Sequence, residues 1–156
     1  MPVRVQTEDF DVARELAALR GGDRAVGAVA AFIGTVRDVN ADARVATMTL
    51  EHYPGMTEKA LSEIVDAAKT RWDIADALVI HRVGALRPAD QIVLVGVTSA
   101  HRGDAFAACE FIIDYLKTRA PLWKKEDTPA GERWVEARAS DDEAALRWEV
   151  AHKPAA

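Results

Sequence analysis

The order in which helical and strand patterns follow one another is the strongest constraint on the fold of this chain. Residues 57–72 place Leu61 and Ile64 on one face of a predicted helix, and residues 104–118 show a second helix of the same kind. Between them lie two strand-like runs joined by a turn that contains Pro88. Strands joined by a short turn pair antiparallel. The pattern therefore predicts antiparallel strands packed against helices, without the strict alternation of a doubly wound sheet.

The same periodicities extend this interpretation to the rest of the chain. Strands are predicted at 3–6, 27–36, 45–53, 77–83, 91–99, 122–126 and 132–137, and helices at 10–20, 57–72, 104–118 and 141–148. The run at 27–36 is small, apolar and β-branched, so we expect a buried strand there. The fold class is α+β, with a mixed, largely antiparallel sheet and helices packed on one face. We expect one domain over residues 1–150 and a flexible tail over 151–156.

Composition excludes several classes of protein. The formal net charge of −5 argues against a nucleic-acid binder, which needs a broad basic face. We find neither a signal peptide nor an apolar run of the roughly 20 residues that span a membrane, so a cytoplasmic location is expected. Cys109 is the single cysteine, and its apolar neighbours predict a buried, inert thiol. The four histidines show no zinc-ligand spacing, and no metal site is predicted.

The segment 114–126 concentrates positive charge in this acidic chain. Pro121 is expected to end a helix and to begin an extended run, so the chain turns between Lys117 and Lys124. Two lysines on either side of a turn can converge on one point. Converging ammonium groups attract an anion, and their repulsion makes either one easier to deprotonate. The alternative is a helix-capping cation at Lys117 and solvated side chains at Lys124 and Lys125.

Other cations also lie at the ends of predicted elements. Arg37 follows the strand at 27–36, where it could hold a phosphate, or could simply pair with Asp38. His101 and Arg102 lie where a strand meets the helix at 104–118, and a helix start favours anions. The alternative there is an ordinary exposed loop. Taken together, these positions predict a cationic pocket that acts by anion binding and proton transfer, without a nucleophile or a metal of its own.

Five longer stretches carry a resemblance to a known family. They are residues 49–61, 80–84, 95–102, 111–126 and 133–138. Over about residues 26–148 the chain resembles the family of the large, catalytic subunit of molybdopterin synthase. The resemblance implies a sulfurtransferase of molybdenum cofactor biosynthesis with a fold like the α/β hammerhead, and it implies no cofactor.

The resemblance also implies a reaction and its partners. Cyclic pyranopterin monophosphate receives two sulfur atoms and becomes the dithiolene of molybdopterin. The sulfur arrives as a thiocarboxylate on the C-terminal Gly-Gly of a small ubiquitin-like sulfur-carrier subunit. The large subunit forms a homodimer, the core of a heterotetramer with one small subunit at each end.

The resemblance assigns roles to individual residues. Lys117 and Lys124 correspond to the catalytic lysines of the family. The positions implied in substrate binding are Arg37, His101, Arg102, Lys117, Lys124, Lys125 and Glu126. Two other functions were weighed: a non-catalytic adaptor for a ubiquitin-like tail, which would not need both lysines, and a phosphate-ester hydrolase, which would need metal-ligand spacing.

Overall fold

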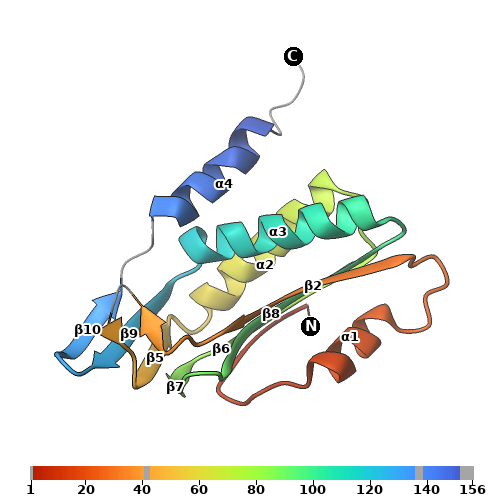
Figure 1. Ribbon diagram of the computed structural model, residues 1–156. Coiled ribbons are helices and arrows are strands. Elements are labelled where there is room, and N and C mark those ends of the chain that lie inside the picture. The colour runs from red at the N-terminus through yellow and green to blue at the C-terminus, as the bar shows by residue number, and fades with distance from the viewer. Residues whose placement is uncertain (1, 41–42, 136–138, 152–156) are drawn as a thin grey trace.

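The computed structural model describes residues 2–40, 43–135 and 139–151, which form two four-stranded sheets, one short strand pair and four helices (Figure 1). The strands are β1 (Val3–Gln6), β2 (Ala28–Thr35), β3 (Val39–Asn40), β4 (Ala43–Arg44), β5 (Thr47–His52), β6 (Asp76–Arg82), β7 (Gly84–Leu86), β8 (Gln91–Ser99), β9 (Leu122–Thr128) and β10 (Gly131–Val135). The helices are α1 (Val12–Arg20), α2 (Met56–Arg71), α3 (Arg102–Arg119) and α4 (Ala139–Ala151).

The first sheet has the order β1-β6-β8-β2 and carries α2 and α3 on one face. Only β1 and β6 pair in parallel within it, and the other neighbours are antiparallel. Val79, Val95 and Val97 are fully buried under the helices and contribute to the largest core cluster. Close packing against these valine side chains holds α3 in one position over the sheet.

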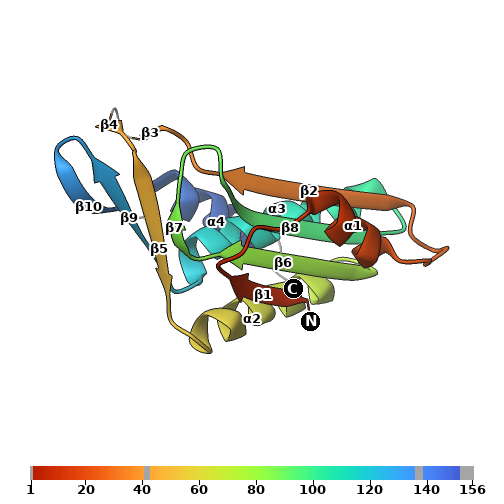
Figure 2. The ribbon, with the colours of Figure 1, turned by 90° about the horizontal axis from the view of Figure 1, so that it is seen from below.

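Helix α1 covers the opposite face of the first sheet (Figure 2). Its Leu16 and Leu19 pack against a separate cluster that includes Ile80 and Leu94. A Cβ at Gly96 would lie 2.9 Å from Leu16 and 3.0 Å from Leu19, so a glycine is what lets α1 approach the sheet so closely. The prediction that helices pack on one face therefore describes α2 and α3, while α1 lies on the other face.

The second sheet has the order β10-β9-β5-β7 and is antiparallel throughout. Met48 and Leu50 of β5 belong to its own small core cluster. Ile92 and Leu122 pack against both this cluster and the main one. The two sheets therefore meet where α3 ends and β9 begins (Figure 1).

The predicted α+β class and largely antiparallel pairing are confirmed. The short strands β3, β4 and β7 were not predicted. The interpretation of residues 27–36 as a buried strand was wrong, because β2 lies at a sheet edge and exposes large apolar side chains at Val29, Phe32 and Ile33. Of the predicted tail 151–156, Ala151 ends α4 and the remainder lies outside the described residues. Within the described part of the chain, no helix is long and apolar enough to cross a bilayer.

Candidate active site

A pocket of about 350 Å³ lies where the two sheets and the C-terminal end of α3 meet. Apolar side chains from β5, β8 and β9 form its floor, among them Leu50, Ile92 and Leu122. Its charged or titratable lining, among the described residues, consists of Arg37, His81, Lys117, Lys124, Glu126 and Asp141. Cations therefore gather beside apolar side chains in one pocket, an arrangement that attracts an anion with an apolar body.

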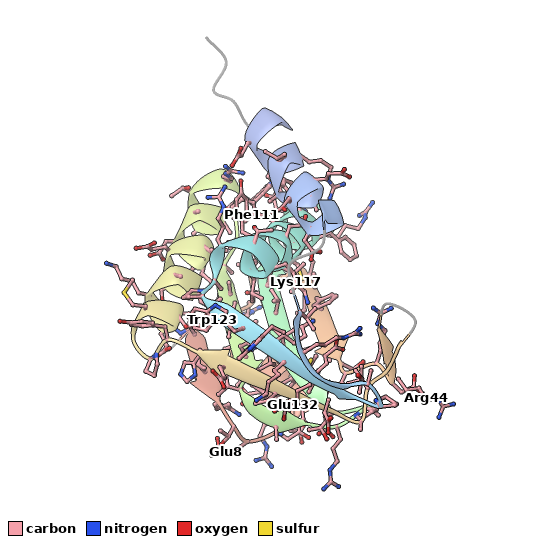
Figure 3. The ribbon with its side chains drawn as sticks, turned by 90° about the vertical axis from the view of Figure 1, so that its left-hand side faces the viewer. Glu8, Arg44, Phe111, Lys117, Trp123 and Glu132 are labelled. Atoms are coloured by element: carbon pink, nitrogen blue, oxygen red, sulfur yellow. The ribbon has the colours of Figure 1, made fainter. Side chains whose placement is uncertain are left out.

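Lys117 and Lys124 reach the pocket from the two sides of a turn. Lys117 lies in the last turn of α3, and Figure 3 shows it between that helix and the β9–β10 pair. The helix stops at Arg119, and Pro121 precedes the first residue of β9. Lys124 then projects into the same pocket from β9. Both lysines line one pocket, as expected for side chains on the two sides of a turn.

The turn is held by Thr57, at the start of α2. Its hydroxyl donates a hydrogen bond of 2.9 Å to the carbonyl of Pro121 and accepts one of 3.0 Å from the backbone N–H of Tyr53. The residue is 0 % exposed, so both bonds are shielded from water. Sequence analysis did not identify Thr57, because a hydrogen bond to a residue 64 positions away leaves no local signal.

Alternation along β9 separates the two neighbouring lysines. Lys124 and Glu126 line the pocket, whereas Lys125 points to the other face of the sheet. Lys125 Nζ lies 3.6 Å from a carboxylate oxygen of Glu132 and 5.7 Å from the centre of the Trp134 ring. In this chain Lys125 therefore lies on the other side of the strand from the pocket that Lys124 enters.

Glu126 is a buried carboxylate within the cationic pocket. Its side chain is among the few buried charged groups, at 3 % exposure, and it pairs with Arg133 at 3.4 Å. A buried carboxylate needs such a partner, since an isolated charge in a protein interior is strongly unfavourable. With Asp141 it supplies negative charge among the cations that line the pocket.

Arg37 follows β2 and lines the pocket with an exposed side chain. The alternative weighed from sequence was an ion pair with Asp38. No such pair occurs between these two residues in the structure, which describes both. Arg37 is therefore available to an anion in the pocket.

His101 and Arg102 lie at the opposite end of α3. His101 is the N-cap residue and Arg102 begins the helix, and both side chains are exposed. The step from Arg102 to Lys117 corresponds to about 22 Å along a helix that rises 1.5 Å per residue. A single chain therefore does not bring these two residues into the pocket of Lys117 and Lys124.

His81 is a pocket residue to which the sequence analysis gave no role. It lies on β6, is 4 % exposed, and its Nδ1 is 2.7 Å from the carbonyl oxygen of Arg82. Burial, and next the charges of Lys117 and Lys124, lower the pKa of His81 to about 4, although the bond to Arg82 opposes the shift. The ring is therefore neutral near pH 7. On a strand, an isolated histidine gives no sequence signal of such a setting.

Cys109 is confirmed as a buried thiol. Burial, with a smaller contribution from Glu110, raises its pKa to about 11, so little reactive thiolate forms near neutral pH. Among the described residues, no three or more His, Cys, Asp or Glu side chains gather as metal ligands would. The chemical groups that line the site, among the described residues, are therefore those of lysine, arginine, neutral histidine and two carboxyl groups, Glu126 and Asp141.

The family model described as MoaE protein matches residues 5–119, which include Arg37, His81 and Lys117. The chain belongs to the MoaE protein family. The match covers both faces of the first sheet and all of α3, and the pocket lies at the end of this matched region.

Similar proteins agree with this assignment. The molybdopterin synthase catalytic subunit of Ralstonia nicotianae is 66% identical over 148 residues, which cover 95% of this chain and 84% of that protein. The solved MoaE protein of molybdopterin biosynthesis from Burkholderia ambifaria is 59% identical, with a TM-score of 0.81 and coverage of 94% and 97% of the two chains. A complex of subunits 1 and 2 of molybdopterin-converting factor from Helicobacter pylori shares the fold, at 18% identity, a TM-score of 0.72 and coverage of 88% and 92%.

Proposed function

We propose that this chain is the catalytic subunit of a molybdopterin synthase. As a sulfurtransferase it moves sulfur from the thiocarboxylated C-terminal glycine of a small ubiquitin-like subunit to cyclic pyranopterin monophosphate, which gives the dithiolene of molybdopterin. The observation that carries the proposal is the pocket that unites Lys117, Lys124 and Arg37 over an apolar floor. Family membership and relatives that bear the name of this catalytic subunit support it.

In this proposal the two lysines are the catalytic residues. The nucleophilic sulfur comes with the partner, so the chain needs no reactive cysteine, in agreement with the raised pKa of Cys109. Lys117 and Lys124 transfer protons to and from the pterin, and they stabilise the oxyanion formed when a thiocarboxylate or an acyl intermediate is attacked. Their positions on a helix end and on a strand give that pair a fixed geometry.

The substrate phosphate is assigned to arginine. Arg37 borders the pocket and offers a planar, bidentate group suited to phosphate. Glu126 is proposed to contact the pterin as a hydrogen-bond acceptor inside the pocket. We keep Lys125 as a substrate-contact hypothesis, although its side chain faces Glu132 and Trp134 in the isolated chain.

We propose that the small subunit inserts its Gly-Gly tail into the pocket, because sulfur cannot transfer at a distance. Capture of a carboxylate terminus by a cationic pocket is a known mode of peptide recognition. The Helicobacter pylori protein with the same fold is a two-subunit complex, which supports a partner of this kind. The account expects association to weaken at high salt, since the tail ends in an anion. A cytoplasmic location remains a prediction.

A homodimer would explain how His101 and Arg102 could belong to a site although they lie far from the pocket of their own chain. Both are exposed at the end of α3 remote from Lys117, and we propose that they complete the site of a second copy of the chain. β2 is an edge strand with a free backbone edge, and it exposes Val29 and Ile33 on one face and Phe32 on the other, features of a strand that pairs with another chain. We propose that two copies form the core of a heterotetramer, with a small subunit at each end.

The decisive assay mixes this chain with a thiocarboxylated small subunit and cyclic pyranopterin monophosphate, and measures the dithiolene product. Product formation that depends on Lys117 supports the enzyme. Binding of the small subunit with no product would favour the alternative, a non-catalytic adaptor for a ubiquitin-like tail. Deleting the terminal Gly-Gly of the small subunit should abolish transfer, even where the folded parts still associate.

A further inference from the structure

We propose that His81 is a positioning residue for sulfur transfer, whose ring accepts a hydrogen bond from one ammonium group of the pocket, that of Lys117 or Lys124, and orients it without cancelling its charge. The inference rests on the proposed function and assigns a role to the one buried imidazole in the pocket.

The tautomer of His81 is fixed by a backbone contact. Nδ1 lies 2.7 Å from the carbonyl oxygen of Arg82, and a carbonyl oxygen can only accept a hydrogen bond. Nδ1 therefore carries the proton and donates it. In a neutral ring the other nitrogen, Nε2, then holds a lone pair and is an acceptor.

The position of His81 on β6 turns the ring toward the helix side of the first sheet. Ile80 belongs to the cluster under α1, whereas Val79 lies in the cluster under α2 and α3. His81 shares the side of Val79, because side chains alternate along a strand. The ring lines the pocket beneath the end of α3, and the charges that act on it come from Lys117 on α3, Lys124 on β9 and His52 on β5.

A neutral acceptor at position 81 adds no further negative charge to a pocket that already holds the carboxyl groups of Glu126 and Asp141. A carboxylate beside Lys117 and Lys124 would also orient them, but it would form an ion pair and reduce the attraction for an anionic substrate. The imidazole stays uncharged because burial and the lysines lower its pKa to about 4. In the proposal, the single lone pair of Nε2 accepts a hydrogen bond from one ammonium group of the pocket and adds no negative charge to it. Positioning of this kind raises the rate by holding reacting groups in the productive geometry.

Two substitutions test the contributions of Nδ1 and Nε2 separately. In His81→Asn the amide N–H replaces Nδ1 and keeps the bond to the Arg82 carbonyl, but nothing replaces Nε2. In His81→Gln the longer side chain places an amide oxygen near the position of Nε2, and the bond to the carbonyl is lost. The experiment measures kcat and KM for dithiolene formation with the thiocarboxylated small subunit, together with the Tm of each variant.

We expect opposite effects in the two variants. His81→Asn should lower kcat by about tenfold or more with little change in KM or Tm, whereas His81→Gln should lower Tm and keep kcat within about threefold of wild type. A purely structural role would make kcat follow Tm in both, and that result would overturn the inference. If His81→Asn does not fold, His81→Gln decides alone, since a folded His81→Gln with a tenfold lower kcat contradicts the proposal.

Lys117→Ala distinguishes this inference from the function on which it rests. If wild type forms no more dithiolene product than Lys117→Ala, the proposed function is refuted, and the role of His81 is refuted with it. An active wild type, an inactive Lys117→Ala and a fully active His81→Asn would refute the role of His81 alone.

Discussion

The two ends of α3 carry cations in very different settings. At the C-terminal end, Lys117 joins Lys124 in a pocket of about 350 Å³, with a turn fixed by the buried Thr57. At the N-terminal end, His101 and Arg102 are exposed and no wall of the pocket reaches them. One chain by itself thus brings Lys117 and Lys124 into one pocket, the part of the site for which we propose proton transfer. The exposed end is suited to complete a site on another molecule.

The largest effect is expected from Lys117→Ala. Removal of a general acid or base typically costs on the order of a hundredfold to ten-thousandfold in rate. Because the side chain is exposed, the fold and the binding of the small subunit should persist. The matched control is Arg119→Ala in the same helical turn, where the side chain pairs with Glu149. Equal losses in both variants would assign the effect to the helix end and not to the pocket.

Acid should destabilise the protein because the His81 ring is neutral in the folded state and protonated in the unfolded state. The unfolded His81 ring gains a proton below pH 6.5, whereas the folded ring has a pKa of about 4. The unfolded state therefore binds more protons between these values, and the free energy of unfolding falls by about 3 kcal/mol as pH drops from above 6.5 to about 4. Urea denaturation across this range measures the loss. His81→Gln should lack this part of the pH dependence, and an identical slope in both proteins would contradict the buried neutral ring.

Truncation of the arginines should affect substrate binding more than chemistry. Arg37→Ala and Arg102→Ala each remove a proposed charged donor to phosphate, for which a loss of about 1.5–3 kcal/mol in binding is expected, roughly tenfold to a hundredfold. Single-turnover kinetics over a range of pterin concentrations separates the binding constant from the rate at saturation. An unchanged binding constant in Arg37→Ala would remove that residue from the phosphate site.

The smallest effect is expected from Thr57→Val, which weakens the C-terminal end of α3 without touching a cation. The change leaves the Pro121 carbonyl and the Tyr53 N–H without their hydroxyl partner, so we expect a loss of about 1–2 kcal/mol in stability and a reduced rate. Thr70→Val is the control, because its hydroxyl lies on the same helix and bonds only the local carbonyl of Ala67. If the two variants behave alike, the turn does not depend on Thr57.

Local signals in the sequence explain what could be predicted of the fold. The spacing of apolar residues predicted α2 and α3, and Pro121 predicted the turn before β9. Periodicity shows that α1 has an apolar face, but not which side of a sheet that face covers. For the same reason β2 was assigned to the interior, since an apolar run does not reveal whether a strand lies at an edge.

The cationic residues of the candidate site could be predicted from the sequence, whereas its uncharged residues could not. Arg37, Lys117 and Lys124 were found because cations clustered at the ends of elements in an acidic chain. His81 and Thr57 were missed, since their importance depends on contacts between segments far apart in the sequence. A strand at β9 implies that Lys124 and Lys125 point to opposite faces. Which of the two faces the pocket became clear only from the position of β9 in the structure.

Mixed dimers test most directly whether the two ends of α3 serve one site that two copies build. Lys117→Ala and Arg102→Ala chains, carrying different tags, are combined and the mixed species is purified and assayed at pterin concentrations well below KM. If Lys117 of one copy works with Arg102 of the other, each mixed dimer holds one intact site and shows about half of wild-type activity. A chain with both substitutions, paired with wild type, should instead be nearly inactive. The account is contradicted if the dimer of Lys117→Ala and Arg102→Ala chains is inactive while the dimer of wild type and the doubly substituted chain keeps half of the activity. That result would place both residues in a site within one chain.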